Sequence, residues 1–162
     1  MQTRREFLLR ASLVGAGLAL LGRKGLALVT GPRSAVTGYA PIPMAVYSDP
    51  NCGCCSKWVS LMDAAGFQTS VQHTTDMASI KKRYGIPADL VSCHTALVGG
   101  YKVEGHVPAD LVKKMLTDKP KIAGLAVPGM VAGSPGMESP NPQRYDVVSF
   151  DAAGKTSVYA RR

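Results

Sequence analysis

Four cysteines carry the chemistry that this sequence can support. Three of them, Cys52, Cys54 and Cys55, form a Cys-x-Cys-Cys motif within the segment DPNCGCCSKW at residues 49–58, and Cys93 stands alone further along the chain. Thiolate sulfur is the nucleophile of disulfide exchange and also a ligand for soft metal ions. The cysteines therefore indicate thiol redox chemistry, disulfide cross-links or a metal site.

The arrangement of the cysteines favours a metal site. Cys52 and Cys55 would suffice for a two-cysteine redox cycle, so Cys54 is superfluous to it, and a disulfide between the adjacent Cys54 and Cys55 would be strained. A structural zinc site usually has two Cys-x2-Cys pairs or their Cys/His equivalents, whereas the cysteines here are distributed three and one. Because each clustered thiolate can bridge two soft ions, we expect a thiolate-bridged Cu(I) cluster, with zinc as the alternative.

A β-hairpin should bring a histidine to Cys93. Residues 94–106, HTALVGGYKVEGH, read as two strands around a Gly-Gly turn. If the two glycines form a two-residue turn, Cys93 lies opposite His106, with β-carbons about 5 Å apart on one face. His94 would then point to the other face, and we expect it to be structural. A slip of one residue in the register would reverse the two assignments.

Two methionines add candidate soft ligands. The Pro- and Gly-rich segment 118–144 contains the near-repeat VPGM and SPGM, which places Met130 and Met137 directly after Pro-Gly turns. A thioether can bind Cu(I), but a methionine beside a tight turn can equally fill the core, and both interpretations remain open. The candidate metal ligands are therefore Cys52, Cys54, Cys55, Cys93, His106, Met130 and Met137.

The hydrophobic pattern predicts an α/β domain. The predicted elements are a strand at 44–48, a helix at 56–65, a strand at 67–73, a helix at 76–84, the hairpin at 94–106, a helix at 108–117 and a second hairpin at 145–160. This order is typical of a thioredoxin-like fold, a central mixed sheet flanked by helices, here with a C-terminal β-hairpin extension. In that fold a Cys-x-x-Cys pair lies between the first strand and the first helix, where Cys52 and Cys55 stand. The fold usually has a cis-proline near this pair, and Cys93 occupies that place without one, which counts against a general thiol oxidoreductase.

The N-terminal segment indicates export. Arg4 and Arg5 precede Phe7 and an apolar run at 11–21, which is too short to span a membrane but fits a twin-arginine-like signal. We therefore expect residues 1–40 to be an export signal and linker, residues 41–162 to be a single metal-binding domain, and the protein to reach the periplasm.

The charge of the chain excludes one class of partner. The net charge is +8, yet residues 1–40 hold six basic side chains and one acidic one, whereas the remainder holds 13 basic and 10 acidic. Because the remainder has no dense basic stripe, nucleic-acid binding is not expected. No membrane span is expected after removal of the signal.

Three segments resemble the CopG-type periplasmic copper-resistance proteins, a family also described as a metal-binding domain of unknown function. They are YSDPNCGCCSKW, GIPADLVSCHTALVGGYKVEGHVPADLVKKML and AGLAVPGMVAGSPGM, and the resemblance covers residues 45–160. It implies a thioredoxin-like fold, a role in periplasmic copper handling, Cu(I)/Cu(II) redox chemistry, and copper ions and other copper-handling proteins as partners. It also implies a cysteine-bridged multicopper site formed by Cys52, Cys54, Cys55 and Cys93, with His106, Met130 and Met137 as weaker candidates.

Two other functions remain open beside copper binding. The first is a periplasmic thiol-disulfide oxidoreductase that uses Cys52 and Cys55, and the second is a domain held together by a structural zinc ion or by two disulfides. Whether the chain is an enzyme is thus undecided. The leading interpretation is a metal-binding protein, and copper oxidoreductase activity is a further option for it.

Overall fold

The computed structural model describes residues 40–162. The predicted signal at residues 1–40 therefore lies, except for Ala40, outside the described residues, and the division of the chain into signal and domain stays a prediction. Within residues 40–162, no helix has the length and apolar character needed to cross a membrane.

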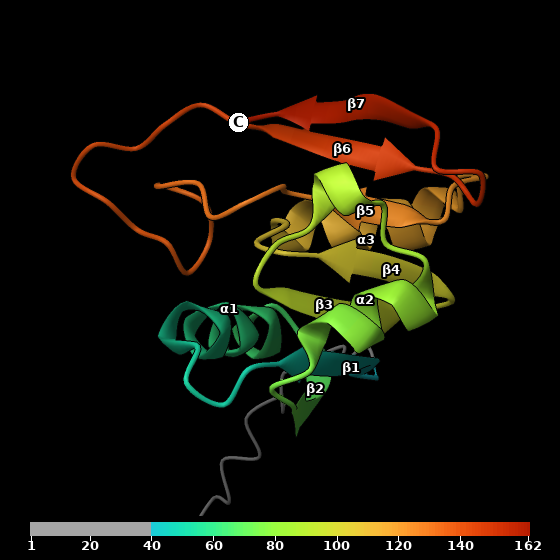
Figure 1. Cartoon of the computed structure of the whole chain (residues 1–162). Helices are drawn as coiled ribbons and strands as arrows, with labels where there is room; N and C mark the ends of the chain where they lie inside the picture. Colours follow the sequence, from blue (N-terminus) through green and yellow to red (C-terminus); the bar gives the residue numbers. More distant parts are fainter. Residues whose placement is uncertain (1–39) are drawn as a thin grey trace, which may run out of the picture. The chain divides into compact units, whose positions relative to one another are not determined.

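One mixed sheet organises the described part of the chain (Figure 1). Its spatial order is β2-β1-β3-β4-β5-β6-β7, with parallel pairing between β1 and β2 and between β4 and β5, and antiparallel pairing elsewhere. The strands are β1 (Ile42–Ser48), β2 (Phe67–His73), β3 (His94–Val98), β4 (Tyr101–Glu104), β5 (Gly124–Ala126), β6 (Asp146–Phe150) and β7 (Thr156–Arg161).

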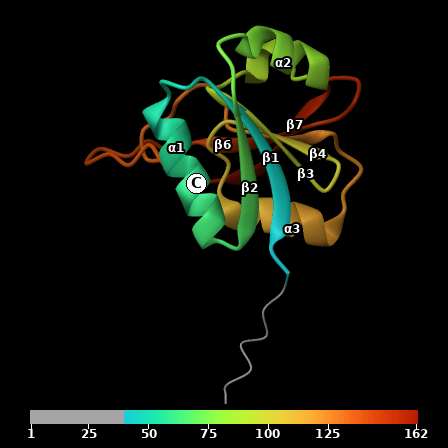
Figure 2. The same cartoon turned by 90° about the horizontal axis from the view of Figure 1, so that it is seen from below.

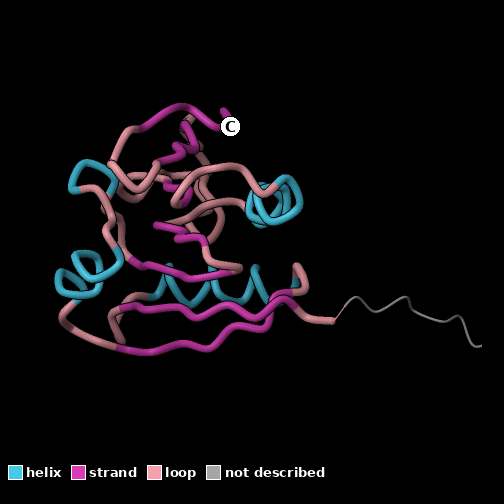
Figure 3. The backbone as a smooth tube through the Cα atoms, turned by 90° about the vertical axis from the view of Figure 1, so that its right-hand side faces the viewer, coloured by secondary structure: helices cyan, strands magenta, loops and turns pink. Residues whose placement is uncertain are grey.

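Helices cover both faces of the sheet, as Figures 2 and 3 show. On one face α1 (Gly53–Ala64) and α3 (Ala109–Asp118) bury apolar side chains against the strands. On the other face lie α2 (Met77–Tyr84) and the short 3-10 helix η1 (Ala88–Leu90). The main core includes Trp58 and Met62 of α1, Leu111, Val112 and Met115 of α3, and the sheet residues Val46, Ala96, Val103 and Leu125.

Most predicted elements are present, and the α/β class is confirmed. The strand at 67–73 and the hairpin with its Gly99-Gly100 turn have the predicted positions, and Val98 pairs with Tyr101 as expected. The first helix begins at Gly53 rather than at residue 56, because Gly53, Cys54 and Cys55 already have helical backbone. The thioredoxin-like assignment within this class stays a prediction.

The three-residue strand β5 was not predicted. Its sequence, Gly-Leu-Ala, is too short to show alternation and lies in a segment rich in Pro and Gly. It pairs with β4 on one side and β6 on the other, so it is the strand through which the predicted C-terminal hairpin joins the sheet. Gly124 is required there, because a β-carbon at this position would lie 2.7 Å from Cζ of Phe150 and would also clash with the Lys102 carbonyl oxygen.

We predict that Gly124→Ala destabilises the protein by about 1–3 kcal/mol, since the added methyl group must displace backbone on one side and a buried ring on the other. The matched control is Gly53→Ala, because a β-carbon at Gly53 has no neighbour within 4 Å. Urea unfolding of the two variants and the parent measures the difference. Equal urea midpoints for the two variants would contradict the prediction, because they would show that β5 accommodates the added methyl group without loss of stability.

Candidate metal centre

The N-terminus of α1 presents three cysteines at one end of the sheet. β1 ends at Ser48, and a turn closed by a 3.1 Å hydrogen bond from the Cys52 N–H to the Asp49 carbonyl leads directly into the helix. Cys52 is the N-cap residue and makes no side-chain capping bond, so backbone N–H groups of the first turn are left for other acceptors. The positive end of the helix dipole favours anionic sulfur at this position.

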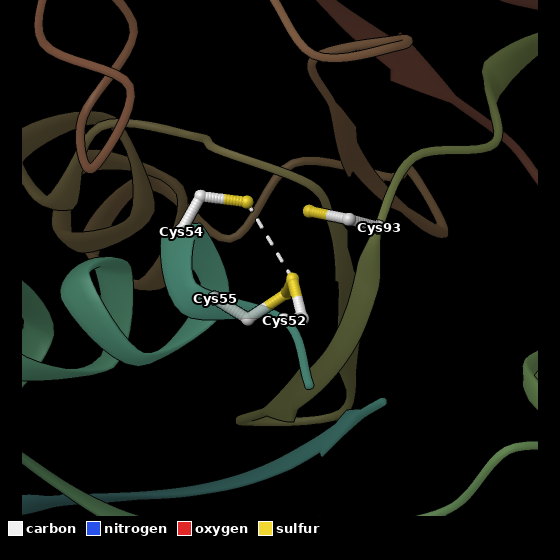
Figure 4. A group of neighbouring side chains, drawn as sticks. All are labelled: Cys52, Cys54, Cys55 and Cys93. Carbon is white, nitrogen blue, oxygen red and sulfur yellow. Dashed lines mark hydrogen bonds between the residues drawn. A yellow bond between two sulfur atoms is a disulfide. The ribbon is translucent and has the colours of Figure 1, made fainter. Parts of the chain in front are cut away.

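The fourth cysteine meets the other three, as Figure 4 shows. Cys93 immediately precedes β3, and its sulfur lies within 4.8 Å of the sulfurs of Cys52, Cys54 and Cys55. Two donor atoms bound at about 2.3 Å to one ion are at most about 4.6 Å apart, so small adjustments suffice for shared metal ions. The predicted convergence of the four cysteines is confirmed.

The four sulfurs are not in one chemical state. Cys52 and Cys55 are joined by a disulfide, whereas Cys54 and Cys93 are free thiols. The sulfur of Cys54 lies 3.5 Å from that of Cys52. Cys55 is buried, whereas Cys52, Cys54 and Cys93 are each partly exposed to solvent. The structure therefore contains a disulfide-bonded Cys-x-x-Cys pair with two additional sulfur donors beside it.

His106 lies against Cys93, as the hairpin register predicts. The distance from the Cys93 sulfur to Nε2 of His106 is 3.0 Å. The other ring nitrogen, Nδ1, is 2.7 Å from the carbonyl oxygen of Pro135, and since a carbonyl only accepts, Nδ1 carries the proton. Nε2 therefore directs its lone pair at Cys93, which is the orientation of a histidine prepared to bind a metal.

His94 was predicted to point away from this site, and that prediction is wrong. Its Nδ1 lies 3.2 Å from the Cys93 sulfur, and its ring lies 5.0 Å from the His106 ring between centroids and 4.3 Å from that of Trp58. β3 begins only at His94, so strand alternation does not fix the direction of Cys93 relative to it. Nε2 of His94 is buried without a hydrogen-bond partner, which is unusual for a purely structural histidine.

Burial keeps these donor groups neutral in the metal-free protein. Desolvation, with a smaller contribution from Cys54, raises the pKa of the Cys93 thiol to about 12. Desolvation also lowers the pKa of His94 to about 3, helped by the neighbouring His106, and it lowers the pKa of His106. Neutral imidazole is the form that binds a metal, and Cys93 must lose its proton when it does so.

The two Pro-Gly-Met turns differ in their relation to the site. A hydrogen bond of 2.8 Å from the Met137 N–H to the Ser134 carbonyl closes the second turn, and Gly136 has the positive φ of 83° that a type II turn requires. A β-carbon on Gly136 would lie 3.0 Å from the Cys54 carbonyl oxygen, so this turn rests on the start of α1. Met137 and Cys54 line one open cavity of about 510 Å3.

Met130, after the first turn, is 60 % exposed. Its neighbour Gly129 donates to the carbonyl of Val91 over 3.1 Å and accepts a hydrogen bond from the Ser92 hydroxyl, so this turn contacts the segment that precedes Cys93. The structure therefore brings Met137 to the cysteines and leaves the side chain of Met130 on the surface.

The sequence pattern missed a buried ionic cluster behind the site. Glu104, at the end of β4, is fully buried and lies 2.5 Å from Nζ of Lys81 on α2. It also accepts hydrogen bonds from the Thr95 hydroxyl and the Ser92 N–H. Burial raises the pKa of Glu104, and the positive charge of Lys81 opposes that shift. The register predicted from the two-residue Gly-Gly turn also places Thr95 opposite Glu104, and this was the available signal for the cluster.

Comparisons with known proteins agree with the site. The family model described as "Protein of unknown function, DUF411" matches residues 90–137. No curated protein sequence matches the chain. Two solved structures named "Copper resistance protein copG", Form 2 and Form 1, are 41% identical to it, with TM-scores of 0.72 and 0.71. In both comparisons the match covers 75% of this chain and 98% of the other.

The chain belongs to the CopG family. The segment matched by the family model includes Cys93, His94 and His106 as well as both Pro-Gly-Met turns, whereas the Cys-x-Cys-Cys motif lies before it. In this CopG-family chain the Cys-x-Cys-Cys motif is separate in sequence from the matched segment, and folding brings it next to Cys93.

We predict that the metal-free protein loses stability between about pH 6.5 and pH 4.5 because of His94. Its folded-state pKa is below its ordinary value of 6.5, so the unfolded chain takes up a proton in this range and the folded chain does not. The expected contribution is about 2–3 kcal/mol, and His106 acts in the same direction.

Urea unfolding at the two pH values should therefore show a smaller loss in His94→Phe than in the parent. His73→Gln is the control, since it replaces an exposed histidine. A loss of the same size in His94→Phe and in the parent would contradict the assignment.

Proposed function

We propose that this chain is an exported copper-binding protein that sequesters or relays Cu(I) in copper resistance, through a multinuclear site bridged by cysteine sulfur. The observation that carries the proposal is the convergence of four cysteine sulfurs and two neutral imidazoles at the start of α1, in a chain of the CopG family. Soft thiolate donors select Cu(I), and imidazole accommodates both Cu(I) and Cu(II).

The donor atoms fall into two groups that support more than one metal ion. One group consists of Cys52, Cys54, Cys55 and Cys93, and the other of Cys93, His94 and His106. Because Cys93 belongs to both groups, its sulfur is placed to bridge ions held by the four cysteines and ions held by the histidines. The imidazole ligands also make cycling of bound copper between Cu(I) and Cu(II) part of the proposal, since they suit both oxidation states.

Metal loading is coupled to protons and electrons. The Cys52–Cys55 disulfide must take up two electrons before its sulfurs can bind as thiolates, and an external thiol reductant can supply them. Cys93, with a pKa of about 12, releases a proton when it binds copper. Affinity for Cu(I) should therefore be higher in the reduced protein than in the disulfide form, and should rise with pH.

A second candidate function is favoured by the disulfide itself. Cys52 and Cys55 have the spacing and the helix N-terminal position of a thiol-disulfide oxidoreductase. In that case Cys54 and Cys93 would not be required for activity. The residues described contain no cis peptide bond, so a cis-proline, the usual substrate-presenting feature near such a pair, is not found beside Cys93.

Location and partners complete the proposal. The twin-arginine-like signal at residues 1–40 supports export to the periplasm, where copper ions and other copper-handling proteins would be the partners.

We predict that the reduced full chain binds more than one Cu(I) ion and that Cys54→Ser reduces this number, because it removes a bridging sulfur. The chain is reduced, freed of reductant without oxygen and titrated with Cu(I) in the presence of a chromophoric chelator, with copper, zinc and free thiols counted. Ser60→Ala is the matched control, since Ser60 is exposed on the same helix. Unchanged disulfide-exchange activity in Cys54→Ser, together with no tight copper binding by the parent, would support the oxidoreductase instead.

We also predict that the two methionines differ. Met137→Leu should speed the release of Cu(I) to a chelator by about tenfold, which corresponds to about 1.4 kcal/mol, because it removes a thioether beside Cys54 while keeping the volume. Met130→Leu is the matched control and should leave the rate unchanged, since this side chain is exposed. Stopped-flow measurement of the rate of Cu(I) transfer to the chelator tests this difference between the two variants. Equal rates would show that Met137 is not a copper ligand.

A further inference from the structure

The segment that carries Cys93 is held from behind by a buried carboxylate. Oε1 of Glu104 accepts a 2.7 Å hydrogen bond from the N–H of Ser92, the residue before Cys93. Oε2 accepts a 2.6 Å hydrogen bond from the hydroxyl of Thr95, two residues after Cys93. The carboxylate therefore contacts the chain on both sides of this cysteine.

Lys81 supplies the opposite charge. Its Nζ lies 2.5 Å from Oε1 of Glu104 and 3.2 Å from the hydroxyl of Thr95, and it comes from α2 on the face of the sheet opposite α1. α2 has no fully buried residue. The link from α2 to the Cys93 segment is thus made by a lysine that is almost wholly covered rather than by apolar packing.

Further contacts fix the same segment. Gly105 donates to the carbonyl of His94 over 2.9 Å. A β-carbon on Gly105 would lie 2.7 Å from the Val127 carbonyl oxygen and against the Ser92 side chain, so the backbones pack closely here. Ser92 also donates through its hydroxyl to the Gly129 carbonyl, and Gly129 in turn binds the Val91 carbonyl. Backbone contacts and the Ser92 side chain limit the segment. Of the two charged groups that bind it, Glu104 bonds on both sides of Cys93, through the Ser92 N–H and the Thr95 hydroxyl, whereas Lys81 bonds to the Thr95 hydroxyl.

A buried ion pair is a poor source of stability. Removing two charges from water costs free energy that their mutual attraction often fails to recover. A protein in which apolar side chains of similar size replace a buried ion pair is therefore commonly as stable as the original. In the described residues Glu104 is the only carboxylate among the fully buried side chains. Its hydrogen bonds converge on the residues that flank a candidate metal ligand, and this location gives the ion pair a positional role.

We infer that Glu104 is a positioning residue of the metal site: through the Ser92 N–H and the Thr95 hydroxyl it holds the Cys93 sulfur between the cysteine cluster and the two imidazoles. The inference rests on the proposed copper-binding function. Glu104 does not bind the metal; Lys81 balances its charge. Residues that orient metal ligands typically change metal affinity by about 10- to 100-fold when they are removed.

Two double variants separate the hydrogen bond from the charge. In K81M/E104Q the ion pair is replaced by neutral side chains of similar size, and the amide oxygen of glutamine can still accept from the Ser92 N–H. In K81M/E104L the size is again conserved, but no acceptor remains for that N–H. Both variants avoid an unpaired buried charge, so both are expected to fold, and K81M is common to them.

Two measurements are made on both variants and on the parent. The first is amide hydrogen exchange at Ser92 in the metal-free chain, which reports the bond to position 104 directly. The second is the affinity of the reduced full chain for Cu(I), by competition with a chromophoric chelator. We expect the parent and K81M/E104Q to protect the Ser92 amide and to bind Cu(I) alike, and K81M/E104L to lose that protection and to bind Cu(I) about 10- to 100-fold more weakly.

Each outcome decides the inference. Equal Cu(I) affinities for the two folded variants, whether both retained or both reduced, would overturn it, because the acceptor would then be irrelevant. Protection of Ser92 in K81M/E104L equal to that in the parent would overturn it as well. If the parent binds no Cu(I), the proposed function fails, and the amide exchange of the metal-free chains still decides whether Glu104 holds the segment. If neither double variant folds, the ion pair is required for folding and the purely positional role is overturned.

Discussion

The antiparallel pairing of β1 with β3 is the constraint on which the site depends. Ser48, the last residue of β1, pairs with His94, the first residue of β3. The chain leaves β1 toward the Cys-x-Cys-Cys motif, and it enters β3 from Cys93, so this single register places both cysteine-bearing segments at the same end of the sheet. Hydrogen bonding between backbones thus brings together residues that are far apart in the sequence.

Local patterns were sufficient where backbone geometry alone decides the outcome. The Gly-Gly turn fixes the hairpin register, and that register places His106 beside Cys93. The prediction for His94 failed because it extended strand alternation to Cys93, which lies outside the strand. β5 was missed because three residues in a Pro- and Gly-rich segment carry no periodicity, and only its neighbours show that it is a strand.

The Lys81–Glu104 ion pair depends on packing between segments, which no local pattern reports. Lys81 lies in a helix with three consecutive basic residues, where a solvent-exposed position is the ordinary expectation. The register does place Glu104 opposite Thr95, but only the position of α2 above them closes the cluster. By contrast, the resemblance of the cysteine and Pro-Gly-Met segments to the CopG family was readable from the sequence, and the solved CopG structures bear it out.

The two Pro-Gly turns bind different cysteine segments, and this restricts how the chain can vary. Gly129 is bonded to Val91 and Ser92 beside Cys93, whereas Gly136 packs against the backbone of Cys54 and Trp58. The few residues between the turns therefore act as a spacer of fixed length across the site. Insertions or deletions between them would separate the two halves of the site.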